Sequence, residues 1–175
     1  FRGEPLVAHA ARLLAAATGR TIVVVGNGAS AVRNALDGSG VQIVENPEWA
    51  EGMSTSLRCG VAAMPSEAEA AIIALGDQPS LDASLVRAIA ARWRETGSAI
   101  VAARYRGTVA PPVLLARSVF GEVAELRGDV GARLLIRRDP ARVSYVEVDA
   151  DLPPDVDTTD DALANLRDAP AYEGD

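Results

Sequence analysis

The fold is decided by the stretch Ala70-Ala-Ile-Ile-Ala-Leu75-Gly-Asp77-Gln-Pro79. An unbroken apolar run that ends at Gly and Pro predicts a buried strand of a parallel sheet. Asp77 then follows the carboxyl end of that strand, where open α/β sheets bind their ligands. A carboxylate there is costly to bury without a positive partner, and a divalent metal ion is the usual partner in a phosphate site. The sequence therefore makes Asp77 a candidate metal ligand.

A second acidic segment lies near the end of the sequence, where Asp155-Val-Asp157-Thr-Thr follows an apolar stretch. We expect residues 143–148 to form a strand, so Asp157 is a second candidate for the carboxyl edge of the sheet. Two carboxylates from separate strand ends that meet at one Mg²⁺ would form a nucleotide site. Asp-Thr-Thr-Asp is also typical of a helix start, and this alternative stays open for Asp157.

The rest of the chain alternates short apolar segments with helical patterns. We expect strands over residues 21–25, 41–44, 70–75, 98–103, 112–116 and 143–148. We expect helices over residues 6–19, 29–36, 54–64, 85–97, 119–126, 129–138 and 157–166. This alternation predicts an α/β protein with a mostly parallel sheet that is covered on both faces. Because there is no repeat or linker, residues 1–167 are expected to form one domain, followed by a disordered acidic tail at 168–175.

Composition narrows the class of protein. The 175 residues are 49% hydrophobic, which suits one soluble domain with a substantial core. The net charge of −7, with no basic block, argues against binding to nucleic acid or to an anionic membrane surface. All 17 basic residues are Arg, so the chain has no Walker-type lysine. The single cysteine, Cys59, and the absence of a membrane-length apolar run predict a cytoplasmic protein.

Two hypotheses for the functional site compete, and the first is a dinucleotide site. The segment Val23-Val-Val-Gly26-Asn-Gly28-Ala-Ser-Ala31 follows an expected strand and opens an expected helix, as such a site requires. Glu45 ends the next strand, about where an acidic residue binds a ribose hydroxyl. This hypothesis predicts a non-catalytic nucleotide- or dinucleotide-binding module. A plain tight turn at Gly26 and Gly28 is the simpler explanation, because Asp37-Gly-Ser-Gly40 ends the helix early.

The second hypothesis combines four separated segments. They are Asn46-Pro-Glu-Trp-Ala-Glu-Gly52-Met-Ser-Thr-Ser56, Gly76-Asp77-Gln-Pro79, Gly128-Asp-Val-Gly-Ala-Arg133 and Asp155-Val-Asp157-Thr158. In this order they resemble the MobA-like nucleotidyltransferases, and in particular the branch that acts on the molybdenum cofactor. The resemblance spans almost the whole chain, and the joint order of the segments is more specific than any one of them.

The resemblance implies a Rossmann-like three-layer α/β/α sandwich and a Mg²⁺-dependent transfer of NMP from CTP or GTP, with release of pyrophosphate. It implies a phosphorylated acceptor, namely a molybdopterin precursor of the molybdenum cofactor, and a molybdoenzyme that receives the product. Carried over by position, Asp77 and Asp157 are implied as catalytic residues that bind Mg²⁺. The implied nucleotide-binding residues are Asn46, Gly52, Met53, Ser54 and Ser56.

The chemistry of these side chains is consistent with the resemblance. Ser54 and Ser56 begin an expected helix, where hydroxyls and free backbone N–H groups bind sugar or phosphate oxygens, although N-capping is the simpler role for Ser54. Asn46 follows a strand end and is a candidate to contact ribose or base, or else a turn residue. Asp129 lies in a loop expected near the acceptor and is a candidate acceptor-binding residue, and it can also cap the helix that follows. Arg133 is a candidate anion contact there, or a solvated surface residue.

The sequence departs from the family at two places. The family's signature loop, L-A-A-G-x-S-x-R-x-G-x-x-K, belongs before the stretch where this sequence begins, together with the first strand. We expect that strand to lie between residues 21–25 and 71–75, so the sequence alone is expected to have two exposed strand edges and to be poorly soluble or inactive. The second departure is Gly107-Thr-Val-Ala110-Pro-Pro112. Ala110 stands where relatives often have His, which leaves open an acceptor other than molybdopterin.

Overall fold

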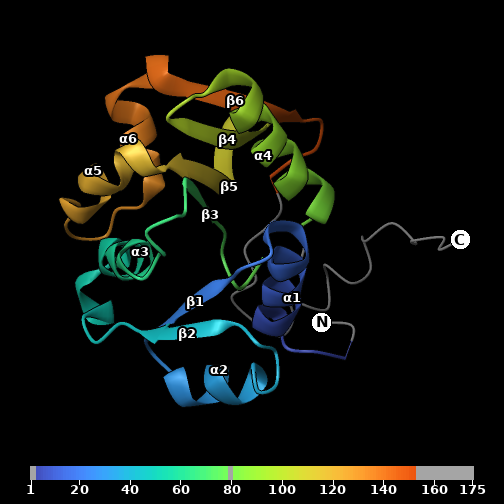
Figure 1. The fold of residues 1–175 in the computed structure, drawn as a ribbon, viewed down its shortest axis with the longest axis vertical. Helices are drawn as coiled ribbons and strands as arrows, with labels where there is room; N and C mark the ends of the chain where they lie inside the picture. Colours follow the sequence, from blue (N-terminus) through green and yellow to red (C-terminus); the bar gives the residue numbers. More distant parts are fainter. Residues whose placement is uncertain (1–2, 79–80, 153–175) are drawn as a thin grey trace, which may run out of the picture.

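The computed structural model describes residues 3–78 and 81–152 and has the mixed α/β architecture that the sequence predicts (Figure 1). Its helices are α1 (Leu6–Thr18), α2 (Ala29–Ala35), α3 (Met53–Ala62), α4 (Ala83–Thr96), α5 (Phe120–Ala124) and α6 (Ala132–Arg138). Its strands are β1 (Ile22–Val25), β2 (Gln42–Glu45), β3 (Ala70–Ile73), β4 (Ile100–Tyr105), β5 (Thr108–Ala116) and β6 (Val143–Val148). Single 3₁₀ turns are formed by Trp49–Glu51, Arg117–Val119 and Pro140–Arg142.

The described strands form two separate sheets. β1 and β2 pair in parallel, and the other four strands form a sheet in the order β3-β5-β4-β6. β4 and β6 are parallel, whereas β5 runs antiparallel to both of its neighbours. The reversal follows from the two-residue turn at Arg106 and Gly107, both with positive φ, which matches the right-handed twist of the hairpin between β4 and β5.

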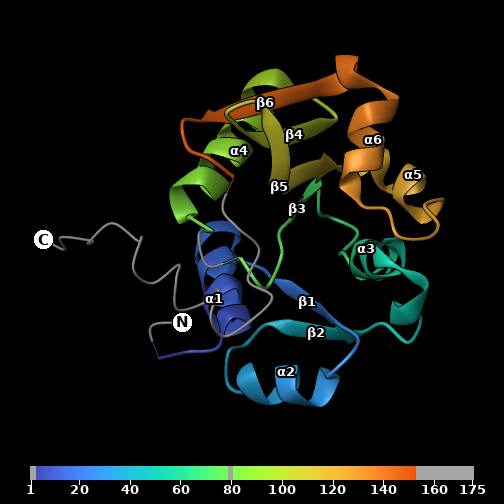
Figure 2. The same ribbon diagram turned by 180° about the vertical axis from the view of Figure 1, so that it is seen from behind.

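Helices cover both faces of the four-stranded sheet (Figure 2). On one face, α3, α5 and α6 contribute Leu57, Val123 and Leu135 to a core built around Ile100 and Leu115. On the other face, Ile89 of α4 packs against alternate residues of β4 and β5 and is completely buried. The result is the three-layer α/β/α arrangement expected from the sequence.

Helix α3 connects the two sheets. It packs against β1 and β2 on one side and against α5 on the other, so it lies between the β1–β2 pair and the four-stranded sheet (Figure 1). In the same way, α1 packs against α4 through Ala10 and Val86. The position of α3 matters for the site, because its first turn carries most of the expected nucleotide-binding residues.

Several elements begin and end where the sequence predicts. Helix α1 ends at Gly19 and α4 at Gly97, both with left-handed backbone, and β6 matches its expected range. The expectation of a fully buried parallel strand at residues 70–75 is wrong in detail. β3 ends at Ile73, its one described partner is the antiparallel β5, and only Ala71 in it is fully buried. β5 also begins earlier than the expected 112–116 segment, because the hairpin turn starts the pairing at Thr108.

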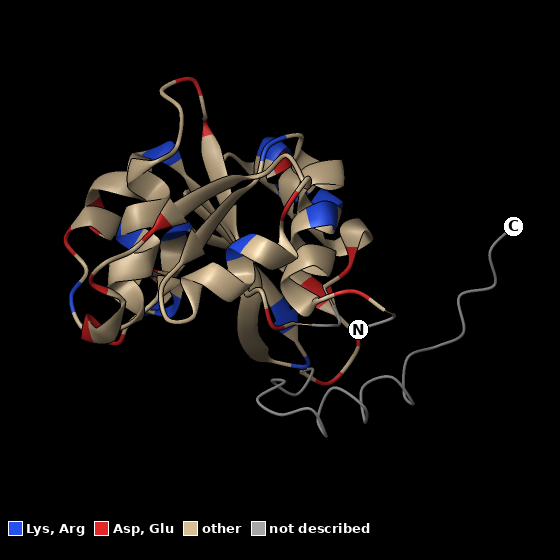
Figure 3. Ribbon diagram, turned by 90° about the horizontal axis from the view of Figure 1, so that it is seen from below, with Lys and Arg blue, Asp and Glu red and all other residues tan. Residues whose placement is uncertain are grey.

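Charged residues of both signs are interspersed along the chain rather than gathered on one face (Figure 3). Several are paired across elements, such as Arg104 with Glu147 and Arg142 with Glu122. In the described part of the chain, no helix is both long and apolar enough to cross a bilayer. The expected acidic tail at 168–175 and the expected helix at 157–166 lie outside the described residues.

Candidate functional site

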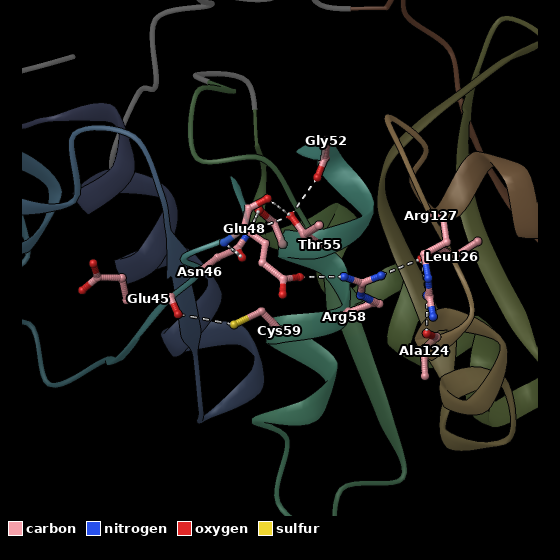
Figure 4. A network of polar contacts seen from close by, with 11 residues as sticks. Glu45, Asn46, Glu48, Gly52, Thr55, Arg58, Cys59, Ala124, Leu126 and Arg127 are labelled. Atoms are coloured by element: carbon pink, nitrogen blue, oxygen red, sulfur yellow. Dashed lines mark hydrogen bonds and ion pairs between the residues drawn. The ribbon is translucent and has the colours of Figure 1, made fainter. Parts of the chain in front are cut away.

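Asn46 is the centre of a buried polar network at the start of α3 (Figure 4). Its side chain, in a residue only 3% exposed, donates from Nδ2 to Oγ1 of Thr55 at 2.8 Å and to Oγ of Ser56 at 3.0 Å. Its Oδ1 accepts from the backbone N–H of Glu48 at 3.0 Å. Its own backbone N–H donates to the carbonyl of Val25, which extends the pairing of β2 with β1. Asn46 therefore fixes the loop to the helix and the sheet, and its amide is fully engaged within the protein.

Thr55 completes this network and was not among the residues predicted from the sequence. Its hydroxyl lies 2.8 Å from the carbonyl oxygen of Gly52 and 3.0 Å from that of Glu48. These contacts close the loop that joins β2 to α3. The available signal was a hydroxyl in the first turn of a helix, and the flanking Ser54 and Ser56 carry the same signal.

The two segments expected to bind the substrates, the nucleotide loop at residues 46–56 and the acceptor segment at residues 128–133, meet at the first turn of α3. The backbone N–H of Met53 donates to Oδ1 of Asp129 at 3.2 Å, and that of Ser54 donates to the carbonyl of Gly128 at 3.3 Å. Gly52 makes this approach possible, because a Cβ atom there would lie 2.6–2.7 Å from the backbone of Gly128 and Asp129. The structure therefore brings the expected nucleotide loop and the expected acceptor loop into direct contact.

These contacts correct two expectations. Asp129 does not cap the helix that follows it, because α6 begins only at Ala132 with Gly131 as its N-cap. Its carboxylate instead caps α3, where a negative charge is stabilised by the helix dipole. The N–H groups at the start of α3 were expected to be free for a ligand. Those of Met53 and Ser54 are already bound by the 128–129 segment.

The serines of this turn differ in their environment. Ser54 is completely buried, and its Oγ has no hydrogen-bond partner in the described structure. It is not the N-cap, since that position is Gly52. Ser56 is half-buried and holds Asn46. Met53 is 51% exposed and Trp49 is 46% exposed, so both present apolar surface to solvent at this loop.

The remaining acceptor candidate, Arg133, lies on the exposed side of α6. One of its Nη atoms donates to the carbonyl of Val109 in β5 at 3.3 Å. No hydrogen bond or ion pair joins Arg133 to Asp129 within residues 3–78 and 81–152. Ala110, the residue noted for its departure from the family pattern, is buried in the core beside Ile89.

Asp77 lies beyond the carboxyl end of β3 in an exposed turn, as predicted. Its carboxylate makes no hydrogen bond or ion pair with any other described residue. A free carboxylate is a hard oxygen donor that suits a divalent cation, so Asp77 fits the role of one metal ligand. Asp157, its expected partner, lies outside the described residues, and no group of three metal-ligating side chains occurs among the described ones.

The residues of the dinucleotide hypothesis have other roles. The carboxylate of Glu45 is paired with Arg33 of α2 at 2.8 Å. Gly26 packs directly against the side chain of Trp49, so this glycine makes room for a tryptophan of the same protein. Gly28 is the left-handed N-cap residue of the short helix α2. This geometry matches the simpler explanation, a tight turn between strand and helix.

Arg58 extends the network from the loop to the acceptor segment (Figure 4). It lies on α3 and is paired through Nη2 with Oε2 of Glu48 at 3.0 Å. Its Nη1 donates to the carbonyl of Leu126 at 3.0 Å. Neither Arg58 nor Glu48 was recognised from the sequence.

Comparisons with known proteins agree with the four-segment hypothesis. The model of the "MobA-like NTP transferase domain" family matches residues 1–143. A nucleotidyl transferase from Methanothermobacter thermautotroptrophicus, Mth528, is 25% identical with a TM-score of 0.76, over 95% of this chain and 83% of that one. Rv0371c of Mycobacterium tuberculosis in complex with manganese is 33% identical with a TM-score of 0.73, over 92% of this chain and 86% of that one.

One relative is named as an oxidoreductase and not as a transferase. The nicotine blue oxidoreductase of Paenarthrobacter nicotinovorans is 31% identical over an alignment of 170 residues that covers 91% of this chain and 82% of the relative. The family match covers the loop at Asn46, the turn at Asp77 and the segment at Asp129, which are three of the four segments singled out in the sequence. The chain therefore belongs to the MobA-like NTP transferase domain family, whose members are nucleotidyltransferase enzymes with a Rossmann-like fold.

Proposed function

We propose that the protein transfers a nucleoside monophosphate from CTP or GTP to a phosphorylated small molecule, a precursor of the molybdenum cofactor, in the cytoplasm. One observation carries the proposal: Met53, in the nucleotide loop, and Asp129, in the acceptor segment, are joined by a 3.2 Å hydrogen bond although 76 positions separate them. A transferase has to hold its two substrates side by side, and the contact between these loops provides adjacent surfaces for them. A molybdoenzyme is the proposed recipient of the product.

In the proposed reaction, a phosphate oxygen of the acceptor attacks the α-phosphorus of the nucleotide. A new P–O bond forms to the acceptor, the bond from the α-phosphorus to the bridging oxygen breaks, and the electron pair leaves with pyrophosphate. Such a transfer depends mainly on positioning and on neutralising the phosphate charge. A bound Mg²⁺ would supply that neutralisation, and Asp77 and Asp157 are its proposed ligands.

The proposed roles of the other residues follow from their exposure. Met53 is exposed and Gly52 is partly exposed, so they are the proposed direct contacts of the nucleotide. Asn46, Ser54 and Ser56 are buried or half-buried, and we assign them to shaping that surface from inside. The acceptor would lie on the other side of the contact, where the side chains of Asp129 and Arg133 are exposed.

Calorimetric titration of the full chain with Mg²⁺-CTP and Mg²⁺-GTP tests the proposal. One of the two nucleotides is expected to bind, and binding is expected to be lost in Asp77→Ala and when the metal is removed with a chelator. Asp37→Ala is the matched control, because Asp37 is an exposed carboxylate in the turn after α2. Equal binding by the wild type and the D77A variant would contradict the metal role.

A second activity is favoured by one observation, the 31% identity to a relative named as an oxidoreductase. The corresponding candidate is a reductase, or the dinucleotide-binding module at Gly26, Gly28 and Glu45, in which Glu45 would have to exchange its ion pair with Arg33 for a ribose hydroxyl. It predicts NADH binding without metal, unaffected by Asp77→Ala. Pyrophosphate release and NADH consumption, measured on the same preparation, separate the two candidates.

A further inference from the structure

Arg58 of α3 hydrogen-bonds to Glu48 in the expected nucleotide loop and to Leu126, two positions before the expected acceptor segment at 128–133 (Figure 4). Its Nη2 lies 3.0 Å from the carboxylate of Glu48, in the loop before α3, and its Nη1 lies 3.0 Å from the carbonyl of Leu126. Leu126 directly precedes the 127–130 segment that carries Asp129. The side chain of Arg58 is 22% exposed, so the guanidinium lies between the two segments rather than in open solvent.

The carbonyl of Leu126 is held in a fixed position. The Leu126 side chain is 1% exposed in the core that α3 and α5 share, and the same carbonyl also accepts from Nη1 of Arg127 at 2.7 Å. The acceptor segment is thus attached to α3 at two places. Arg58 binds Leu126, just before the segment, and the first turn of α3 binds its beginning, where Ser54 N–H donates to the carbonyl of Gly128.

We propose that Arg58 is a positioning residue that couples the nucleotide loop to the acceptor segment, so that binding at the first orders the second. This inference rests on the proposed function, because it assigns the two loops to two substrates. Arg58 acts through Glu48 and Leu126 and contacts neither substrate itself.

The chemistry of the guanidinium explains why an arginine serves this role. Its planar group presents several donors in fixed directions, so it can bind a carboxylate and a carbonyl at the same time. A lysine ammonium is a single charged group on a flexible chain and does not reproduce that geometry. The Glu48 carboxylate is 55% exposed, and exposed ion pairs contribute little to stability, so the main effect of Arg58 is on the relative position of the loops.

Hydrogen exchange measured by mass spectrometry on the full chain tests the coupling, with Mg²⁺-CTP and Mg²⁺-GTP as probes. In the wild type, the nucleotide that binds is expected to slow exchange in residues 46–56 and also in residues 126–131. In Arg58→Gln and Arg58→Lys, slowing is expected in 46–56 alone, and exchange in 126–131 of the free protein is expected to rise about tenfold, the effect of one lost charged hydrogen bond. The affinity for nucleotide is expected to stay within about twofold, as for other exposed ion pairs.

Two further variants test the coupling from its other end and from outside the site. Glu48→Ala removes the partner of Arg58 in the loop before α3 but leaves the bond from Arg58 to the Leu126 carbonyl, so nucleotide is expected to slow exchange in 46–56 and no longer in 126–131. Arg92→Gln breaks an exposed ion pair on α4, between Arg92 and Glu95, and is expected to change nothing in either segment.

Each other outcome is decisive. If the variants R58Q and R58K keep the wild-type response in 126–131, Arg58 does not couple the loops and the inference is overturned. The same conclusion follows if nucleotide slows exchange in 46–56 of the wild type without any effect in 126–131. If neither nucleotide slows exchange anywhere in the wild type, the proposed function fails and the inference fails with it. R58K retains the positive charge, which keeps the test interpretable if R58Q folds poorly.

Discussion

The side chain of Trp49 lies directly against Gly26, so closely that a Cβ atom at Gly26 would come within 2.5 Å of the Trp49 Cβ and 2.8 Å of its Cγ. Gly26 follows β1, and Trp49 begins the 3₁₀ turn in the loop after β2. The glycine therefore determines how closely the loop between β2 and α3, the proposed nucleotide loop, approaches the β1–β2 pair.

Replacing Gly26 with Ala should destabilise the protein by about 1–3 kcal/mol, the usual cost of inserting an atom into a well-packed place. The free energy of unfolding, measured by urea denaturation, gives the effect. Gly121→Ala is the matched control, because nothing lies within 4 Å of the added Cβ and Gly121 is in the helix α5. That control should be neutral or slightly stabilising. An equally stable G26A variant would show that Trp49 moves aside freely.

Asn46→Ala should destabilise the protein by about 2–3 kcal/mol, because it removes a buried side chain that makes three hydrogen bonds as two donations and one acceptance. The hydroxyls of Thr55 and Ser56 and the N–H of Glu48 lose their bonds to the amide. Urea denaturation measures this loss as well. Asn34→Ala, at an exposed position of α2, should stay within about 0.5 kcal/mol of the wild type. Similar values for the two variants would contradict the structural role of Asn46.

Gly52→Ala should separate the proposed nucleotide loop from the proposed acceptor segment, because the added Cβ would collide with the backbone of Gly128 and Asp129. Loss of nucleotide transfer should therefore accompany loss of stability. Gly97→Ala provides the comparison, since Gly97 also has a positive φ but has no atom within 4 Å of the added Cβ. It should cost only the backbone strain of about 1–2 kcal/mol and leave transfer intact. Pyrophosphate release by both variants is the measurement. Normal transfer by G52A would rule out a functional role for this contact.

The ion pair between Glu122 and Arg142 should make part of the stability depend on acid pH. The hydrogen bond from Arg142 holds the pKa of Glu122 below its ordinary value. The pKa of Glu122 is therefore lower in the folded than in the unfolded chain. The ion pair contributes fully to the free energy of unfolding above the ordinary glutamate pKa of about 4.3, and this contribution is lost as the pH falls through the pKa of the folded state.

This contribution should be below about 1 kcal/mol, because the pair is partly exposed. Glu122→Gln should therefore weaken the fall in stability between neutral and acid pH, as measured by urea denaturation at a series of pH values. Glu125→Gln removes an exposed carboxylate just after the same helix and serves as the control. Identical pH profiles for the wild type and E122Q would contradict the role of the pair.

The sequence predicts well what depends on local patterns. The apolar periodicity of Leu85 and Ile89 identifies α4, and the glycines at positions 19 and 97 mark the ends of two helices. The sequence predicts less well which strands pair with each other when they lie far apart along the chain. The partner of β3 is β5, which lies more than 30 positions further along the sequence, and β5 itself is reversed by a turn at Arg106 and Gly107 that no apolar pattern marks.

The same distinction applies to the site. The family resemblance implied Asn46, Gly52, Met53 and Ser54 through one continuous segment, and the structure places them in one loop and helix start. The roles of Asp129 and Arg58 could not be predicted, because their partners are 76 and 68 positions away. For Asn46 the sequence left open a ligand contact or a turn residue, and its inward-facing amide, with Oδ1 accepting from the N–H of Glu48, has the geometry of a turn residue.

The inward-facing amide of Asn46 has a consequence for recognition. Because the loop between β2 and α3 is already fastened to the sheet on one side and to the helix on the other, a molecule that docks there meets a surface that is ordered in advance. Little conformational entropy of the protein is then lost on association, so affinity depends on how well the ligand fits a preset shape. If the loop binds the nucleotide as proposed, selectivity between similar nucleotides would come from rejecting a poor match, not from the loop adapting to each one.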